Sequence, residues 1–219
     1  MLKYLSLLVI TILTVLPPAL AQAPRSEVSL GVPIELSKRS TFTKEGPAFQ
    51  SERATLEPST TYGILVSYRY HFARRHGVEV NYGFSRPTQN YNVVNIATNQ
   101  LAGGISVQSR VQEMTAAYVF SPMQKSRFHP FLLGGAGVLK FDPMGNSQAG
   151  IVGLESQIKT AYLYGGGGEL RFTKKFALRV QYRGLIYRPP TFSAFTLVGF
   201  GGGTLGHIAE PTIGVAYRF

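Results

Sequence analysis

The sequence predicts an all-β protein: a closed antiparallel eight-stranded transmembrane β-barrel, preceded by a cleavable signal peptide. Two observations lead to it: eight segments alternate apolar and non-apolar residues, and short and long connections alternate between them. After the N-terminal stretch, no apolar run approaches the ~18 residues that a spanning helix needs. A closed barrel is the other structure that satisfies every backbone polar group in hydrocarbon.

The N-terminal stretch has the organisation of a signal peptide. Lys3 supplies the positive start, residues 5–16 are apolar, and Ala19-Leu20-Ala21 is a small-x-small cleavage pattern. The apolar run is short and ends at Pro17-Pro18, which argues against a retained membrane anchor. We therefore expect a signal peptide over residues 1–21 and a barrel domain over residues 22–219.

Four predicted strands lie in the first half of the barrel domain, over residues 27–37, 61–72, 77–85 and 105–120. Each has the period of two that places alternate side chains on opposite faces. In the second and third, Val66 and Val80 share the apolar face, whereas Arg69 and Glu79 lie on the other. The fourth likewise sets Met114 against its charged neighbour at position 113. The first has one aliphatic face, which consists of Val28, Leu30, Val32, Ile34 and Leu36.

Four more strands are predicted over residues 130–141, 160–172, 176–187 and 212–219. The fifth is the weakest, because glycines interrupt its apolar face. The seventh is the clearest: Leu178 and Val180 alternate with Arg179 and Gln181. The last strand alternates up to the aromatic residue Phe219. These patterns complete the eight strands.

The connections between these strands alternate in length. Short ones cover residues 73–76, 121–129 and 173–175, and long ones cover about 38–60, 86–104, 142–159 and 188–209. Long connections without secondary structure are unusual in compact soluble domains. Short periplasmic turns and longer outside loops are typical of spanning barrels. The sequence therefore predicts four extracellular loops and both termini on the periplasmic side.

Charged residues gather on the face opposite the apolar one, which indicates an inside-out barrel with a polar lumen. Two interpretations remain open: a polar path for small solutes, or ion pairs that fill a closed lumen. Eight strands leave an interior that side chains can fill, and buried charges must be paired, which favours the second. The predicted lumen charge network consists of Arg69, Glu79, Glu113, Glu169, Arg171, Arg179, Arg183 and Arg218.

The whole chain after residue 21 resembles the small eight-stranded outer-membrane β-barrel family that includes the OmpA transmembrane domain and OmpX-like proteins. The resemblance rests on a glycine-rich strand over residues 164–172, the turn at Lys174-Lys175 and the arginine-bearing strand over 178–183. It also rests on the last eight residues, which resemble the family's C-terminal targeting strand. Its polar, glycine and aromatic positions are Thr212, Gly214, Tyr217 and Phe219.

This resemblance implies a location in the bacterial outer membrane. It implies contact with outer-membrane lipids and lipopolysaccharide, and recognition of the C-terminal strand by the barrel-assembly machinery. The chain carries 22 Lys and Arg residues against 11 Asp and Glu residues. A nucleic-acid ligand would explain this basic charge, but the predicted export of the protein argues against one. Anionic lipid phosphates or acidic polymers outside the cell fit the charge better.

We expect a structural or surface-interaction role through the extracellular loops, with no catalytic residue, cofactor or metal site. A narrow pore or conduit for small solutes is the alternative, and a lipid-A-modifying enzyme is the third hypothesis. The chain has no cysteine, so it has no thiolate metal site and no cysteine nucleophile. Only His207 with Glu210 lies near the predicted outer rim, and we interpret this pair as loop polarity.

Deletion of Phe219 is expected to impair assembly in cells more than refolding in detergent. One terminal aromatic contributes little to the stability of a whole hydrogen-bonded barrel, whereas the resemblance gives it a role in recognition during assembly. The truncated chain should refold in micelles with a small loss of stability, yet accumulate in the periplasm or be degraded. Fractionation of cells measures this, and normal outer-membrane levels of the truncated chain would contradict the prediction.

Overall fold

The computed structural model describes residues 26–44, 52–96, 98–123, 127–144, 155–190 and 205–219. The predicted signal peptide lies outside these ranges. None of the described residues belongs to a helix long and apolar enough to span a membrane. Regular structure in these ranges consists of β-strands, which form one continuous sheet.

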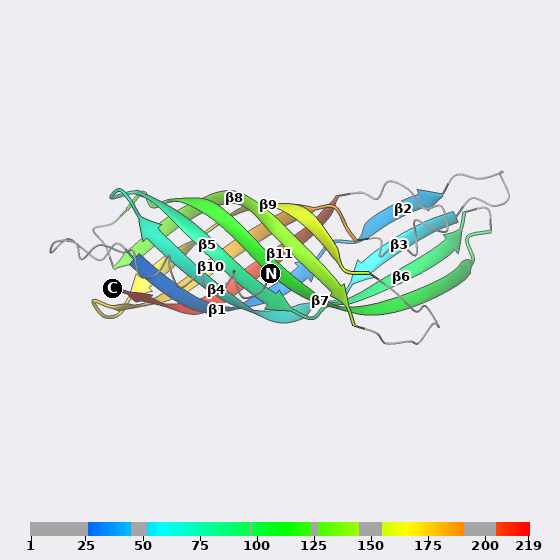
Figure 1. Cartoon of the computed structure of the whole chain (residues 1–219), viewed down its shortest axis with the longest axis horizontal. Coiled ribbons are helices and arrows are strands. Elements are labelled where there is room, and N and C mark those ends of the chain that lie inside the picture. Colours follow the sequence, from blue (N-terminus) through cyan, green and yellow to red (C-terminus); the bar gives the residue numbers. More distant parts are fainter. Residues whose placement is uncertain (1–25, 45–51, 97, 124–126, 145–154, 191–204) are drawn as a thin grey trace.

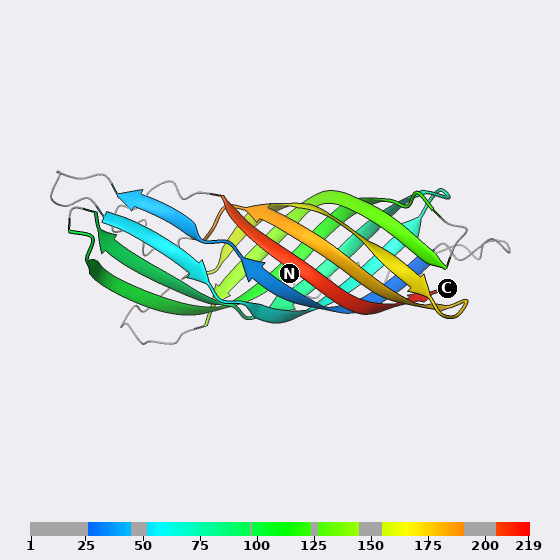
Figure 2. The same cartoon turned by 180° about the vertical axis from the view of Figure 1, so that it is seen from behind.

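Eight of these strands close into an antiparallel barrel, as the sequence predicted (Figures 1 and 2). Each strand pairs with the next one around the barrel, and pairing between the first and last strands completes the ring. Both described ends of the chain lie at the end of the barrel with the short turns. The barrel strands are β1 (Ser26–Ser37), β4 (Thr61–His71), β5 (His76–Ser85), β7 (Leu101–Phe120), β8 (Phe128–Pro143), β9 (Gln157–Arg171), β10 (Phe176–Tyr187) and β11 (Gly206–Arg218).

Two of the predicted loops are ordered strands, so the expectation of irregular structure over 38–60 and 86–104 was wrong. These regions contain β2 (Ser40–Lys44), β3 (Glu52–Pro58) and β6 (Thr88–Asn95), which pair in the order β2, β3, β6, β7. Together with residues 101–108 of β7, they form what we call the extracellular sheet, after the side of the membrane that the sequence predicts for these loops. It extends beyond the barrel at the end opposite the short turns (Figure 1). Ladder pairing satisfies backbone groups that irregular loops would leave to water.

The barrel wall is apolar outside and largely polar inside. In β10, Val180 is 52% exposed, whereas its neighbours Arg179 and Gln181 are buried in the lumen. The same alternation runs along β5, where Val80 is exposed and Glu79 is fully buried. A soluble barrel would turn its apolar face inward, so this arrangement requires lipid on the outside.

Aromatic side chains line the short-turn end of the outer wall. The ring of Phe176 lies 6.5 Å from that of Phe172 and 5.2 Å from that of Tyr217, and Tyr217 lies 6.1 Å from Phe219. This row crosses from the turn after β9 to the end of β11, at the level where the strands leave the apolar band. Aromatic girdles at this position are typical of spanning barrels.

Val180→Arg is expected to destabilise the barrel by about 2–4 kcal/mol, because this outward position lies near the middle of the lipid-facing band. Ile158→Arg should cost only about 0–1 kcal/mol, because Ile158 pairs with Lys140 at the extracellular boundary of the band. Urea unfolding of the protein in lipid vesicles measures both. Equal costs at the two positions would contradict the assigned depth.

Candidate functional site

The lumen holds a buried group of three arginines and three glutamates near the short-turn end. We call this group the lower cluster; it consists of Glu27, Arg69, Glu79, Glu169, Arg179 and Arg218. Six strands contribute one residue each, namely β1, β4, β5, β9, β10 and β11. The side chains are between 0% and 10% exposed. Because positive and negative charges are equal in number, the cluster can be buried without excess charge.

The lower cluster is cross-linked across the lumen, with Glu169 at its centre. Arg69 Nη1 donates to Glu169 Oε1 over 2.7 Å, Arg179 Nη2 donates to the same oxygen over 2.9 Å, and Arg218 Nη2 donates to Oε2 over 2.6 Å. The Arg69 guanidinium also lies 4.2 Å from the ring centre of Phe131, which closes the β8 side of the cluster. Charge-assisted bonds of this kind fix side-chain positions across the ring of strands.

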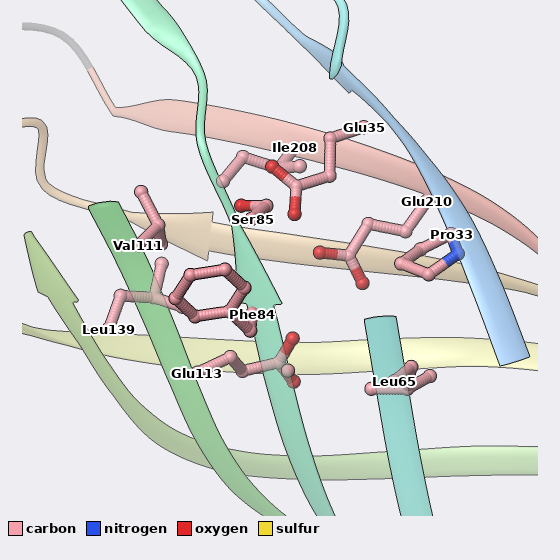
Figure 3. A pocket seen from close by; sticks show the side chains of 11 residues that line it. Pro33, Glu35, Leu65, Phe84, Ser85, Val111, Glu113, Leu139, Ile208 and Glu210 are labelled. Atoms are coloured by element: carbon pink, nitrogen blue, oxygen red, sulfur yellow. The ribbon is translucent and has the colours of Figure 1, made fainter. Parts of the chain in front are cut away.

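A second charged group, the upper cluster, lies further toward the extracellular end. Arg183 forms ion pairs with Glu113 and Glu210, the latter over 3.2 Å. Glu35, Glu113 and Glu210 face a small pocket from different strands (Figure 3). Ser85 also lines the pocket. The upper cluster thus consists of Glu35, Glu113, Glu210 and Arg183, with three carboxyl groups and one guanidinium, so it has an excess of acidic groups.

Glycine makes room for the upper cluster on the neighbouring strand. Gly165 is the ladder partner of Arg183. A Cβ atom at Gly165 would lie 2.3 Å from the Tyr182 carbonyl oxygen. Any side chain there would push β9 away from β10. The glycine-rich stretch of β9 thus allows close strand approach beside a bulky inward arginine.

Apolar side chains fill the lumen beside the upper cluster and above it. In β10 and β11 they lie further toward the extracellular end than the charged residue of the strand, because Leu185 and Tyr187 follow Arg183 and Ile208 precedes Glu210. In β8, Leu139 is the ladder partner of Glu113. The rings of Phe141 and Tyr187 stack with centroids 5.6 Å apart. The apolar plug, as we call this group, consists of Leu56, Val111, Leu139, Phe141, Leu185, Tyr187 and Ile208.

The structure brings together seven of the eight residues of the predicted lumen network. Arg69, Glu79, Glu169, Arg179 and Arg218 lie in the lower cluster, and the other two in the upper cluster. The eighth, Arg171, makes no ion pair within the described residues. It lines the periplasmic mouth together with two histidines.

Sequence reasoning missed three buried carboxylates. Glu27 and Glu35 lie on the polar face of β1, where the alternation with the aliphatic face could have revealed them. The interpretation of Glu210 with His207 as loop polarity was wrong, because both lie in β11. Glu210 is buried in the lumen, whereas His207 contacts Tyr164 on the outer wall, with His207 Nε2 2.8 Å from the phenol oxygen. Because side chains alternate along β11, His207 and Glu210 lie on opposite faces of the barrel wall.

The four residues of the predicted C-terminal targeting strand lie in or at the end of β11. Thr212 and Gly214 pair with Pro33 and Gly31 of β1. The backbone N–H of Phe219 donates to the Ser26 carbonyl oxygen over 3.1 Å. The strand that the resemblance assigns to assembly is thus also the strand that closes the ring.

The extracellular sheet presents polar groups and is joined to the barrel through Leu56. Leu56 of β3 is 1% exposed and belongs to the apolar plug. Arg39 and Glu57 form an exposed ion pair near the base of the sheet. Ser106 donates a hydrogen bond of 2.7 Å to the side-chain oxygen of Asn90, across β6 and β7. The sheet is therefore packed on the barrel mouth at its base, and these two polar contacts are exposed.

Comparison with known proteins identifies the fold. The family model described as outer membrane protein beta-barrel domain matches residues 5–219. No curated protein sequence matches the chain. Among solved structures, the outer membrane protein OprG from Pseudomonas aeruginosa is 15% identical, with a TM-score of 0.56 over 90% of this chain and 97% of that chain.

Two further structures are similar. Ail, the attachment invasion locus protein of Yersinia pestis, is 18% identical, with a TM-score of 0.44 over 90% of this chain and 100% of that chain. The outer membrane protease OmpT from Escherichia coli is 8% identical, with a TM-score of 0.50 over 92% of this chain and 99% of that chain. Identities this low show a shared fold and carry no function across. On the family match, the chain belongs to the outer membrane protein β-barrel family and is a protein of the bacterial outer membrane.

Proposed function

We propose that this protein has a structural and surface-interaction role: the barrel anchors the extracellular sheet and loops, which meet partners outside the cell. One observation carries the proposal. The described lumen is filled by apolar side chains and two sets of buried ion pairs, while β2, β3 and β6 pair with the end of β7 in a sheet beyond the barrel. The ordered surface is therefore outside the membrane, on the segment most accessible to partners.

The filled lumen argues against the alternative of a narrow pore. In the described barrel, a solute would have to pass the apolar plug and then two sets of buried ion pairs. Removing one partner from a buried ion pair costs several kcal/mol, so opening such a path is expensive. The fit of these layers to an eight-stranded ring supports a structural lumen.

The positions of His207 and Glu210 argue against the hypothesis of a lipid-modifying enzyme. Catalysis by a histidine and a carboxylate needs both within hydrogen-bond reach of one nucleophile. His207 and Glu210 are on opposite faces of the β11 wall. The similarity to a protease at 8% identity supports only the fold. We therefore propose no catalytic residue.

For assembly, we propose that the barrel-assembly machinery reads Thr212, Gly214, Tyr217 and Phe219 before the ring closes. In the closed barrel, the polar face of β11 is buried and its backbone is paired on both sides. Recognition of the whole strand therefore fits an open intermediate better than the finished barrel.

Arg183→Met is expected to destabilise the barrel by about 3–5 kcal/mol, because Glu113 and Glu210 would be left buried without a cation. Adding Glu113→Gln and Glu210→Gln to this variant should recover much of the loss. Arg39→Met is the control, because its pair with Glu57 is exposed and worth about 0–1 kcal/mol. Urea unfolding in lipid vesicles measures all three, and a loss no larger than that of the control would contradict a structural role for the upper cluster.

The surface role is tested by removing the extracellular sheet while keeping the barrel. Replacing residues 39–59 and 87–108 by short turns leaves the barrel ladders intact up to the pairs Glu35–Thr61 and Ser85–Val111. Bacteria that display the full chain should adhere to immobilised acidic polysaccharides, which suit its basic charge, and bacteria that display the shortened chain should not. Heat-modifiable gel migration verifies that the shortened barrel is closed.

In planar bilayers, the full chain is expected to give no stepwise ion conductance. The pore would be favoured if the full chain conducts ions and if cells that display it adhere no better than cells that lack the protein. Conductance only in Arg183→Met would instead support a lumen that the ion pairs keep closed.

A further inference from the structure

Two arginines face each other on the outer wall, at the extracellular boundary of the lipid-facing band. Ser85 pairs with Val111 in the antiparallel ladder of β5 and β7, and the Ser109 N–H donates to the Pro87 carbonyl oxygen, so Arg86 and Arg110 between them are opposite each other. Ser85 and Val111 are buried in the lumen. Their neighbours therefore point outward by the alternation of the strand. The Arg86 guanidinium lies 5.4 Å from the ring centre of Phe84, the preceding outward residue of β5.

Lys140 of β8 extends this pair into a row of three cations. Arg110 pairs with Asp142 in the ladder of β7 and β8, and Gln112 pairs with Lys140. Lys140 and Asp142 alternate with the buried residue Phe141, so both face outward. The Lys140 ammonium lies 3.0 Å from the Asp142 carboxylate, and the side chains are 42% and 25% exposed.

The charges of this row are not balanced. Within the described part of the chain, Asp142 is the acidic partner of Lys140, and Arg86 and Arg110 form no ion pair. The Nε of Arg110 is buried and has no hydrogen-bond partner there. Like charges directly opposite each other on a ladder are destabilising. An anion between the two guanidinium groups would remove the repulsion and supply acceptors for their N–H groups.

The surface directly below the row is apolar. Tyr82, Met114 and Val138 are 51%, 60% and 41% exposed, and they are neighbours, because Met114 pairs with both of the others. They continue the same three strands toward the middle of the membrane. A ligand that fits both surfaces has a negatively charged head with several acceptor oxygens, and acyl chains that run along the wall. Phosphate matches the bidentate geometry of guanidinium groups better than a single point charge does.

We propose that Arg86, Arg110 and Lys140 form a binding site for a phosphorylated glycolipid of the outer leaflet. Its phosphate lies between the two arginines, and its acyl chains pack on Tyr82 and Met114. The site is on the wall and separate from the extracellular sheet, so it is independent of the proposed surface function.

The test measures binding of bisphosphorylated lipid A to the full chain in detergent micelles. In Arg86→Gln/Arg110→Gln, lipid A affinity should fall about tenfold or more, because two charge-assisted contacts to phosphate are lost. Lys174→Gln/Lys175→Gln is the matched control: it removes the same charge from an exposed turn at the periplasmic end, and its affinity should stay unchanged. Heat-modifiable migration verifies closure of each barrel, and Arg86→Lys/Arg110→Lys, which keeps the charge, should bind with intermediate affinity.

Further ligands identify the part of the lipid that is recognised. Lipid A from which both phosphates have been removed should bind as weakly to the full chain as intact lipid A binds to the double glutamine variant. Inorganic phosphate should bind far more weakly than lipid A, because it cannot use the apolar surface. Equal affinity for dephosphorylated lipid A, equal affinity for free phosphate, or an equal loss in the lysine control would overturn the proposal.

Discussion

Pairing between β1 and β11 is the constraint on which the rest of the structure depends. In hydrocarbon, an open sheet edge would leave a row of backbone N–H and C=O groups without partners, at several kcal/mol each. The ladder from Glu27–Arg218 to Ser37–Ile208 removes that edge. Closure also defines two surfaces, since one face of every strand meets lipid and the other meets the lumen. Only after the ring has closed does the apolar face of each strand meet lipid and its polar face line the lumen.

The narrow lumen then determines how its charges are arranged. Eight strands bring opposite walls within reach of one arginine side chain, so Arg179 contacts carboxylates from β1, β5 and β9. Burial without water requires such pairing, and it joins strands that are not neighbours in the ladder. The lower cluster balances its charges, whereas the upper cluster keeps an excess of carboxyl groups beneath the apolar plug. The two levels of the lumen thus differ in electrostatics although both are buried.

Beyond the membrane, water can satisfy the backbone, and the ring no longer has to be closed. There β2, β3, β6 and the upper part of β7 form an open sheet. Leu56 is its link to the apolar plug, so the sheet and the barrel share one core. At the boundary between the two regions, Arg86 and Arg110 lie above exposed apolar side chains. This boundary is where we propose a lipid phosphate, and the sheet above it is where we propose surface partners.

The sequence by itself determined the barrel strands and their inward and outward faces, because a period of two is a local property: Val180 and Gln181 differ in environment through alternation alone. It also placed Arg183 and Glu113 on the inward face. It did not show the pairing of β2 with β3 and of β3 with β6, whose short polar strands carry no clear alternation. Only the tertiary structure decided which charges meet. Arg218 donates to Glu27 across 191 residues of chain, because ring closure brings the ends together. A local sequence pattern cannot indicate a contact between residues so far apart in the chain.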